Sequence, residues 1–325
     1  MMRFLLLITL AWNILQITAT KRPNIVVLLA DNLGYEDVSW FASDARDDSA
    51  ASSTPNIDRI GRDGLTFTNW NSAAHLCSAS RAALLTGQYP ARLGVYPGVF
   101  HPDAKLGMST QTQTLASRLK QLGYSTRLVG KWHLGHQYAY LPIHFCFDEY
   151  LGVPYHMSGG SVDNHTCNYD ELQVQWLPLY HNAKIIQQPV QTQHLGSTYA
   201  KYATDFVQQA KQPYLLYMAF SHVHQLCASA NWPEQSTCQW SGQGSTFRDA
   251  ISEMDWIVGQ ILNAIEDDDT IVVFTSDNGP WVAEQSCAGL KGPFQGQWLK
   301  DNTDPSCTAC PHDYVPNPTP DRPRR

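Results

Sequence analysis

Charged side chains are scarce in this 325-residue chain, at 16% of the residues against 43% hydrophobic ones. That balance is typical of a folded globular protein and excludes a largely disordered chain. Positive charge is scarcer still, because 22 lysines and arginines stand against 29 acidic residues and leave a net charge of −7. We therefore expect no surface for nucleic acid or another polyanion, although a local basic pocket for one anion fits this composition.

The chain also lacks an uninterrupted hydrophobic run long enough to cross a membrane. Its N-terminus comes nearest, with Arg3, a short apolar run and then small residues up to Thr20. This order is typical of a cleaved signal peptide, which we assign to residues 1–20. A secretory route agrees with the eight cysteines, which suggest disulfides whose pairing the sequence does not fix, and with the glycosylation sequon at Asn164.

The stretch around which the chain is organised is residues 76–87, L-C-S-A-S-R-A-A-L-L-T-G. Ser78 and Ser80 are predicted to cap a helix that strong helix formers continue. Arg81 follows Cys77 by about one helical turn, so the guanidinium and the sulfur can face one pocket. The helix N-terminus adds exposed N–H groups, and together these features predict an oxyanion site beside a nucleophile position. Alone, such a pattern more often marks a buried or disulfide-bonded cysteine.

Two predicted strands end in an acid-amide pair. Residues 24–30 and 270–276 are continuous apolar runs, typical of strands buried on both faces of a parallel sheet. The first ends in Asp31 and Asn32, and the second in Asp277 and Asn278. Because α/β sheets place ligand sites at the carboxyl ends of their strands, these pairs predict a divalent-cation site with oxygen ligands. A turn-capping role is the alternative for Asp31.

Two more predicted strands end in basic or imidazole side chains. Residues 125–130 lead into K-W-H-L-G, and residues 214–220 lead into S-H-V-H. His222 and His224 would point to opposite faces of an extended chain, so we expect only one of them in the site.

The remaining periodicity predicts helices and one short strand. Helices are expected from Pro55, with Thr54 as N-cap and with Gly61 and Gly64 at the end, around 115–122, over 197–211 and over 247–266. The last carries a core stripe of apolar residues: Ile251, Met254, Val258, Ile261 and Ile265. Residues 65–70 are expected to form a short strand.

Three motifs occur together in the order C-S-A-S-R-A-A-L-L-T-G, K-W-H-L-G and D-N-G. With D-N at residues 31 and 32, they resemble type I sulfatases of the alkaline-phosphatase-like superfamily over residues 22–298. Within that family the chain is most like the arylsulfatase A and G group, through residues 277–281 and 292–294. The resemblance implies the superfamily's α/β sandwich, with a mostly parallel central sheet and helices on both faces.

The resemblance also implies a reaction, the hydrolysis of a small-molecule or glycan sulfate ester. The nucleophile would be formylglycine, made from Cys77 by the formylglycine-generating enzyme. Arg81 and His133 would steady that group, while Lys131 and His224 would neutralise charge on the sulfate and the leaving group. One calcium ion would be held by five residues: Asp31, Asn32, Cys77, Asp277 and Asn278.

Several positions depart from the family pattern. Ala79 stands where proline is usual, and Asn32 replaces a carboxylate, which predicts weaker calcium binding because ligand charge raises affinity. His156 occupies the place of a site serine, and whether it or Ser158 substitutes stays open. The family's further sulfate-contacting lysine is not found in its motif, although Lys291 and Lys300 follow the last strand.

Beyond residue 298 the resemblance stops. We expect a catalytic part at residues 21–298, a proline-rich disordered tail at 299–325 and a missing C-terminal subdomain, which would leave an apolar patch uncovered. The C-x-x-C pair of Cys307 and Cys310 suggests a local disulfide rather than a redox centre.

Two other functions stay open. An impaired sulfatase-like protein with a binding role or no role would fit the departures. A phosphoryl hydrolase of the same superfamily fits less well, since such enzymes generally use serine or threonine and two zinc ions. The sequence names neither the substrate ester nor the compartment, lysosomal or extracellular.

Overall fold

The computed structural model describes residues 22–42, 53–96, 98–157, 177–226, 239–240, 247–266, 269–281 and 289–294. Five features predicted above lie outside these residues: the signal peptide, the sequon at Asn164, Ser158, Lys300 and the tail with Cys307 and Cys310. Among the described helices, none combines the length and the apolar character that a membrane crossing needs.

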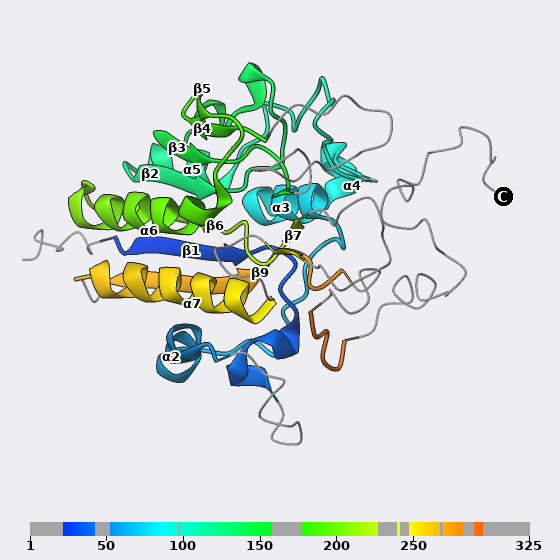
Figure 1. Ribbon diagram of the computed structural model, residues 1–325. Coiled ribbons are helices and arrows are strands. Elements are labelled where there is room, and N and C mark those ends of the chain that lie inside the picture. The colour runs from blue at the N-terminus through cyan, green and yellow to red at the C-terminus, as the bar shows by residue number, and fades with distance from the viewer. Residues whose placement is uncertain are drawn as a thin grey trace, which may run out of the picture.

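Within the described residues, seven strands form one sheet in the order β5-β4-β3-β2-β6-β1-β9 (Figure 1). Their bounds are β1 Asn24–Ala30, β2 Ser125–Gly130, β3 Glu149–Gly152, β4 Leu179–His181, β5 Lys184–Gln187, β6 Tyr214–Ala219 and β9 Thr270–Ser276. The pairs β1–β6, β1–β9, β2–β6 and β2–β3 are parallel, while β4 and β5 add an antiparallel hairpin. The predicted mostly parallel sheet is confirmed.

The register places the carboxyl ends of the central strands at one edge. Ala30 pairs with Ser276, and Gly130 pairs with Ala219. The backbone of Gly130 is packed so closely there that a Cβ atom would lie 1.7 Å from the carbonyl oxygen of Ala219. The residues that follow these strands therefore meet at one side of the molecule.

Helices cover both faces of the sheet, as the sequence predicts. The helices on one face are α2 Pro55–Asp63, α6 Thr192–Gln209 and α7 Phe247–Ala264, and those on the other are α3 Cys77–Thr86, α4 Pro90–Leu93 and α5 Leu115–Gln121. Figure 1 shows α6 and α7 side by side along β1. Short 3-10 helices complete the described elements: η1 Tyr35–Asp37, η2 Ser39–Phe41, η3 Tyr138–Tyr140 and η4 Pro142–Phe145, together with the small pair β7 Gln225–Leu226 and β8 Gln239–Trp240.

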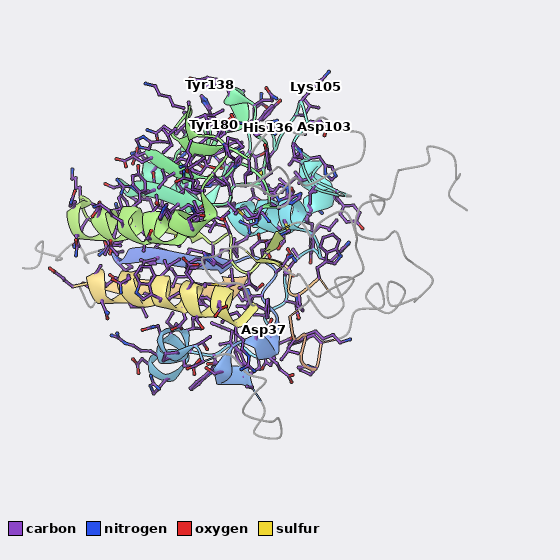
Figure 2. The ribbon with its side chains drawn as sticks, in the orientation of Figure 1. Asp37, Asp103, Lys105, His136, Tyr138 and Tyr180 are labelled. Carbon is purple, nitrogen blue, oxygen red and sulfur yellow. The ribbon has the colours of Figure 1, made fainter. Side chains whose placement is uncertain are left out.

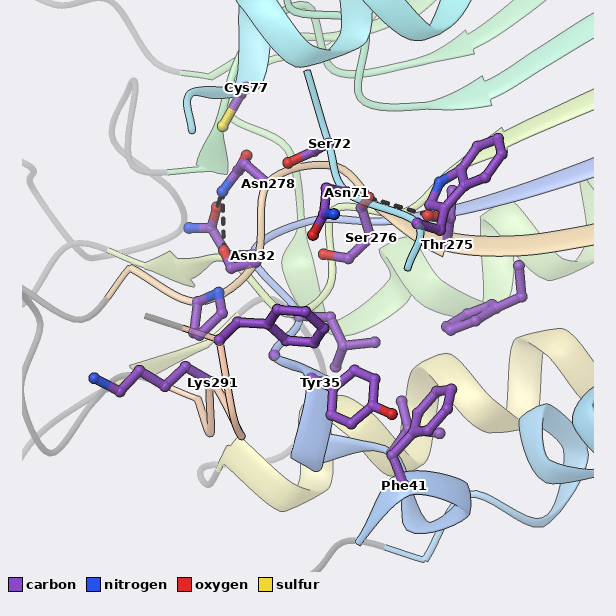
Figure 3. A pocket seen from close by; sticks show the side chains of 18 of the residues that line it. Asn32, Tyr35, Phe41, Asn71, Ser72, Cys77, Thr275, Ser276, Asn278 and Lys291 are labelled. Atoms are coloured by element: carbon purple, nitrogen blue, oxygen red, sulfur yellow. Dashed lines mark hydrogen bonds between the residues drawn. The ribbon is translucent and has the colours of Figure 1, made fainter. Parts of the chain in front are cut away.

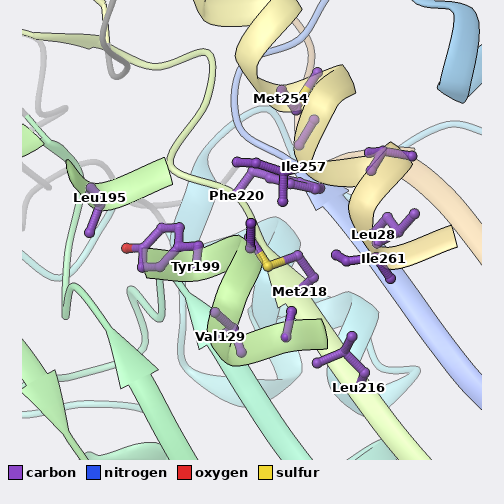
Figure 4. Close-up of a cluster of buried hydrophobic side chains, with 14 of the residues drawn as sticks. Leu28, Val129, Leu195, Tyr199, Leu216, Met218, Phe220, Met254, Ile257 and Ile261 are labelled. Carbon is purple, nitrogen blue, oxygen red and sulfur yellow. The ribbon is translucent and has the colours of Figure 1, made fainter. Parts of the chain in front are cut away.

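The larger core lies between the sheet and the pair α6 and α7. Figure 4 shows Met254, Ile257 and Ile261 of α7 packed towards Met218 of β6 and Leu28 of β1. The predicted stripe on α7 is buried in this core, with Ile265 partly buried at its end. This packing fixes β1 and β6, and with them the strand ends that carry the polar residues.

Three helix boundaries differ from the predictions. Helix α3 begins at Cys77 with Leu76 as its N-cap, so Ser78 and Ser80 lie inside the helix and do not cap it. Helix α2 continues past Gly61 to Asp63, while its predicted N-cap Thr54 and its predicted end at Gly64 are confirmed. Helix α6 begins at Thr192, five residues before the predicted start, because its first turns pack against α7.

Two expectations about strands need correction. Residues 65–70 form no strand, and Leu65, Phe67 and Trp70 are exposed. Strand β9 has the predicted bounds, but Ile271 and Val273 are exposed, so it is not buried on both faces. Among the described residues, no strand pairs with residues 65–70, and no element covers the face of β9 that carries Ile271 and Val273. Strand propensity needs such partners to take effect.

Candidate active site

The predicted site residues gather where four parallel strands and one helix end or begin. Strands β1, β9, β2 and β6 are followed by Asp31–Asn32, Asp277–Asn278, Lys131–His133 and His224, and α3 begins with Cys77 and carries Arg81 one turn later. Direct contacts or a shared cavity join all nine residues. The structure thus brings together each residue that the sequence analysis named for the catalytic and metal sets.

Two serine hydroxyls anchor α3 to the sheet. Ser78 Oγ donates to the carbonyl oxygen of His133 at 2.7 Å, and Ser80 Oγ donates to the carbonyl oxygen of Asp277. Both serines are buried, so these bonds replace the capping role that the sequence predicts for them. Since one bond goes to the end of β2 and the other to the end of β9, the first turn of α3 is held rigidly, and so is Cys77.

A buried network of two cations and two carboxylates lies below Cys77. Lys131 Nζ is 2.6 Å from Asp31 Oδ2, and Arg81 Nη2 is 2.9 Å from Asp277 Oδ2 and 3.4 Å from Asp31 Oδ1. Arg81 Nη1 also donates to the carbonyl oxygen of Lys131 at 3.0 Å. These four residues, which we term the charged end, are at most 2% exposed and carry opposite charges in equal number. Buried charges are tolerated only when they are paired in this way.

The network shifts the pKa values of its members. Burial raises the pKa of Asp277, and the neighbouring Asp31 raises it further, while Arg81 and Lys131 oppose the shift. Burial alone would lower the pKa of Arg81, but Asp277 and Asp31 outweigh it and hold that pKa above its ordinary value. Arg81 is therefore a permanent cation at this site.

Cys77 is a neutral thiol in this setting. Its sulfur lies 3.7 Å from Asp31 Oδ1, and burial raises its pKa to about 12 against the opposing effect of Lys131. Since the thiolate is the nucleophilic form of cysteine, the unmodified side chain is poorly suited to attack a substrate.

The strand ends offer a set of oxygen donors suited to calcium. Ligand atoms of Asp31, Cys77 and Asp277 lie within 4.8 Å of one another. Asn278 Oδ1 is buried without a hydrogen-bond partner in the described part of the chain, whereas Asn278 Nδ2 donates to Asn32 Oδ1 at 2.8 Å (Figure 3). Carboxylate and amide oxygens are the ligands that calcium prefers. The residues present fit such an ion, with Asn32 as the weakest donor because its oxygen already accepts a bond.

Histidines form the wall opposite the carboxylates. His133 has a φ of 60°, and within the described structure both of its ring nitrogens are buried without a hydrogen-bond partner. Burial lowers its pKa well below the ordinary value, and Lys131 and His156 add to this effect. His224 lines the same cavity, while His222 lies with Nε2 3.4 Å from Glu253 Oε2. His156 also faces the cavity, as does His101, which the sequence analysis did not single out.

The cavity above the charged end has a volume of about 1100 Å³ and extends far beyond the strand ends. Its far side, which we term the apolar end, consists of Leu65, Phe67, Trp70, residues 271–274 of β9 and an aromatic cluster. In that cluster Tyr35 stacks on Phe41 at 4.2 Å between ring centroids, and Phe294 meets Tyr35 edge-on at 5.1 Å (Figure 3). The sequence analysis expected an apolar patch but gave no means of finding its position.

Residues 289–294 close one side of the cavity by docking on η1. The Asp37 carboxylate, labelled in Figure 2, accepts the N–H groups of Gly34 and Leu290, each at 2.7 Å. Glu36 N–H donates to the carbonyl oxygen of Leu290 at 3.1 Å. A Cβ atom at Gly289 would lie 2.0 Å from Asp37 Oδ2, so glycine is required for this approach. The docking places Lys291 among the residues that line the cavity.

Comparison with known proteins gives consistent matches. A family model described as Sulfatase matches residues 23–309. The chain is 36% identical to arylsulfatase G of Rattus norvegicus over 310 residues, and 36% identical to arylsulfatase A of Homo sapiens over 294 residues. These alignments cover 86% and 85% of this chain and 56% of each relative, so the chain spans just over half the length of the curated relatives it matches.

Solved structures agree with the fold. The crystal structure of Ps i-CgsB superposes with a TM-score of 0.67 at 25% identity, covering 85% of this chain and 62% of that one. The PsFucS1 sulfatase from Pseudoalteromonas sp. gives a TM-score of 0.65 at 24% identity, covering 87% and 60%. The phosphonate monoester hydrolase of Agrobacterium radiobacter, at 17% identity and a TM-score of 0.52 over 85% and 66%, shows the fold alone.

Proposed function

Since this chain belongs to the sulfatase family, we propose that it acts as an arylsulfatase-like sulfuric ester hydrolase. With water as the second reactant, it would convert a sulfate ester to an alcohol or phenol and free sulfate. The observation that carries the proposal is the position of Cys77 at the start of α3, directly above the charged end and open to the cavity. The substrate ester stays unassigned within the class of small-molecule and glycan sulfates.

The nucleophile in this proposal is formylglycine, produced from Cys77 by the formylglycine-generating enzyme. Its hydrated aldehyde would supply a hydroxyl nucleophile, which the neutral thiol cannot replace. Arg81 and the two serine anchors of α3 hold residue 77 in place, and His133 lies beside it on the cavity wall. A modification in the secretory pathway also requires the signal peptide, so we propose a lysosomal or extracellular location.

The cofactor in this proposal is one calcium ion held by Asp31, Asp277, Asn278 and residue 77, with Asn32 as a weaker ligand. A bound calcium would act as a Lewis acid towards sulfate oxygens. His224 lines the cavity, and Lys131 lies buried beneath it with Nζ on Asp31; both would offset negative charge on the sulfate group and the leaving oxygen. Preorganised donors of this kind cost no rearrangement when the substrate reacts.

The decisive experiment follows residue 77. The full chain, expressed in a secretory host that contains the formylglycine-generating enzyme, should show formylglycine in the tryptic peptide by mass spectrometry. It should hydrolyse 4-nitrophenyl sulfate faster than 4-nitrophenyl phosphate, and Cys77→Ala should lower that rate by a factor of about 10³ or more. Cys146→Gly is the matched control, because Cys146 is exposed and its φ of 67° suits glycine. Turnover that survives Cys77→Ala would refute the proposal.

A second candidate is a sulfatase-like protein that binds a sulfate ester with little or no turnover. The hydrogen bond from Asn278 Nδ2 to Asn32 Oδ1 favours this candidate, because it occupies an oxygen that would otherwise be a calcium ligand. In addition, Asn32 contributes no carboxylate charge to the metal site. Binding of the ester without hydrolysis, in protein that carries formylglycine, would support this candidate over the first.

A further inference from the structure

Three adjacent parallel strands each deliver one histidine to the cavity. Strands β3, β2 and β6 are neighbours in the sheet, and they are followed by His156, His133 and His224. The segment after β2 stays paired with the segment after β3, since the N–H of His133 donates to the carbonyl oxygen of Pro154 at 3.0 Å. The backbone therefore fixes the spacing of these side chains, and His156 belongs to the same built wall as the other two.

The three rings form a continuous row with His156 in the middle. The ring centroids of His133 and His156 are 5.3 Å apart, and those of His156 and His224 are 5.2 Å apart with 20° between the ring planes. All three side chains are buried, and all three line the cavity. We term this set the imidazole row.

The charge of Lys131 acts on two members of the row, His133 and His156. Burial lowers the pKa of His156 well below its ordinary value, and the other contributions, from His224, Lys131 and His101, act in the same direction. Lys131 is itself buried, and its Nζ is 2.6 Å from Asp31 Oδ2. The two ring nitrogens of His133 have no hydrogen-bond partner in the described structure although they are fully buried, and such groups normally have one. A small anion would accept the N–H of the His133 ring, and the charge of Lys131 would favour its binding.

We propose that His156 contacts the ligand, donating a ring N–H to an oxyanion held between the imidazole row and Lys131. That oxyanion is the sulfate group of the substrate or the free sulfate product. This identification of the anion rests on the proposed function. An imidazole N–H can donate to a sulfate oxygen, and hydrogen bonds that involve a charged partner exceed neutral ones in strength. His156 would thus add an anion contact that this chain supplies from β3.

The test measures inorganic sulfate binding to the full chain by isothermal titration calorimetry near pH 6, where histidine protonation responds to an anion. His156→Phe keeps a ring against His224 but removes the N–H groups, whereas His156→Asn keeps a donor but removes the ring. We expect His156→Phe to weaken sulfate binding about tenfold or more and His156→Asn to weaken it less. Titrations in two buffers of different ionisation enthalpy should show proton uptake with sulfate, reduced in His156→Phe.

His136→Gln is the matched control. His136 packs edge-on against Tyr155, with 5.6 Å between the ring centroids, and Tyr155 directly precedes His156 in sequence. His136 itself is not among the residues that line the cavity. Figure 2 labels it with Asp103 and Lys105 on the side of the molecule away from Asp37. Its substitution should leave sulfate affinity unchanged, while thermal unfolding of each variant verifies the fold.

Unchanged sulfate affinity in a folded His156→Phe variant would overturn the proposal, as would a wild-type chain that binds no sulfate. If His156→Phe does not fold, a sulfate titration of the wild-type chain is followed by NMR. The proposal expects sulfate to shift the imidazole resonances of His156, and resonances that stay unchanged would overturn it. Hydrolysis is measured separately with 4-nitrophenyl sulfate. Sulfate binding that depends on His156 without ester hydrolysis would refute the proposed function alone.

Discussion

At the charged end of the cavity, ionised side chains are almost wholly removed from water, whereas at the apolar end large hydrophobic side chains lie open to it. Arg81 is 2% exposed and Lys131 is 1% exposed, while Leu65 is 86% exposed and Phe67 is 66% exposed. This inverts the usual distribution, in which charges face solvent and apolar residues are buried. From this contrast we expect one end to be stable in its own contacts and the other to be covered by a further surface.

Substitutions at the charged end should lower the free energy of unfolding more than substitutions at the apolar end. Arg81→Leu would leave Asp31 and Asp277 buried with one cation between them, so we expect a loss of about 3–5 kcal/mol in the free energy of unfolding. Urea unfolding measures this loss. Arg59→Leu is the control, because Arg59 pairs with Asp63 at 3.6 Å on the surface, where such pairs contribute at most about 1 kcal/mol. Equal losses in the two variants would contradict the contrast drawn here.

Asp37 lies at the border of the two ends and should give a pH-dependent effect. Burial raises its pKa from 3.8 to about 6, so between these pH values the folded protein binds more protons than the unfolded chain. Stability from this group is therefore greatest below pH 4 and falls as the pH rises to about 6. Relative to Asp37→Asn, we expect the wild type to lose up to about 3 kcal/mol between pH 4 and pH 7.

Urea unfolding of both proteins across that pH range checks the prediction, because the difference between them cancels the other carboxylates. The variant also loses one of the two hydrogen bonds that Asp37 accepts from Gly34 and Leu290, which lowers its stability at every pH. A difference that does not change with pH would show that Asp37 has an ordinary pKa in the folded state.

The parts of the fold that the sequence predicts are those decided by local composition. Strands β1 and β9 have their predicted bounds because apolar runs end there in polar residues, and β2 has its predicted bounds as well. The clustering of Asp31, Asp277 and Lys131 follows from the rule that parallel strands end at one edge. The start of α3 was mispredicted because Ser78 and Ser80 bond to distant carbonyl oxygens, a choice that only the tertiary structure makes.

The apolar end was beyond sequence reasoning for a related reason. The alternating pattern of residues 65–70 indicates a strand, but pairing depends on a neighbour elsewhere in the fold. Likewise, the sequence of β9 predicts a buried strand, but the exposure of Ile271 and Val273 depends on what covers that face of the strand. The row formed by His156 with His133 and His224 needed the order β3-β2-β6, which no local pattern reveals.

The metal site offers a sharper test of the charged end. Asn32→Asp adds a carboxylate next to Asp31 and Asp277 while keeping an oxygen that can accept the bond from Asn278. Because ligand charge raises calcium affinity, we expect binding to tighten about tenfold, measured by calorimetry on the full chain. Asn71→Asp is the control, since Asn71 lines the same cavity but is not among the proposed calcium ligands. Unchanged affinity in Asn32→Asp would place residue 32 outside the calcium ligands.

The smallest effect on folding is expected at the apolar end. Leu65, Phe67 and Trp70 contribute little to the core because they are exposed, so replacing all three by serine should change the free energy of unfolding by less than about 1 kcal/mol. The same change should have a large effect on association. Exposed apolar clusters bind other surfaces, and the outer edge of β9, with no charged residue over 270–276, offers a template for a further strand.

Sedimentation velocity on the full chain separates these two effects. We expect the wild type to self-associate as its concentration rises and the triple serine variant to stay smaller, with equal unfolding curves for both. Joining the C-terminal part of a relative such as arylsulfatase G to this chain should abolish association without the serines, because the relatives extend well beyond the matched 56% of their length. It should also raise the rate on 4-nitrophenyl sulfate, since an added anion contact can be worth a factor of about 10²–10³. The opposite outcome is a wild-type chain that stays monomeric and is equally active with and without the extension. This outcome would show that the apolar end needs no cover, and the contrast between the two ends would then reflect amino-acid composition alone.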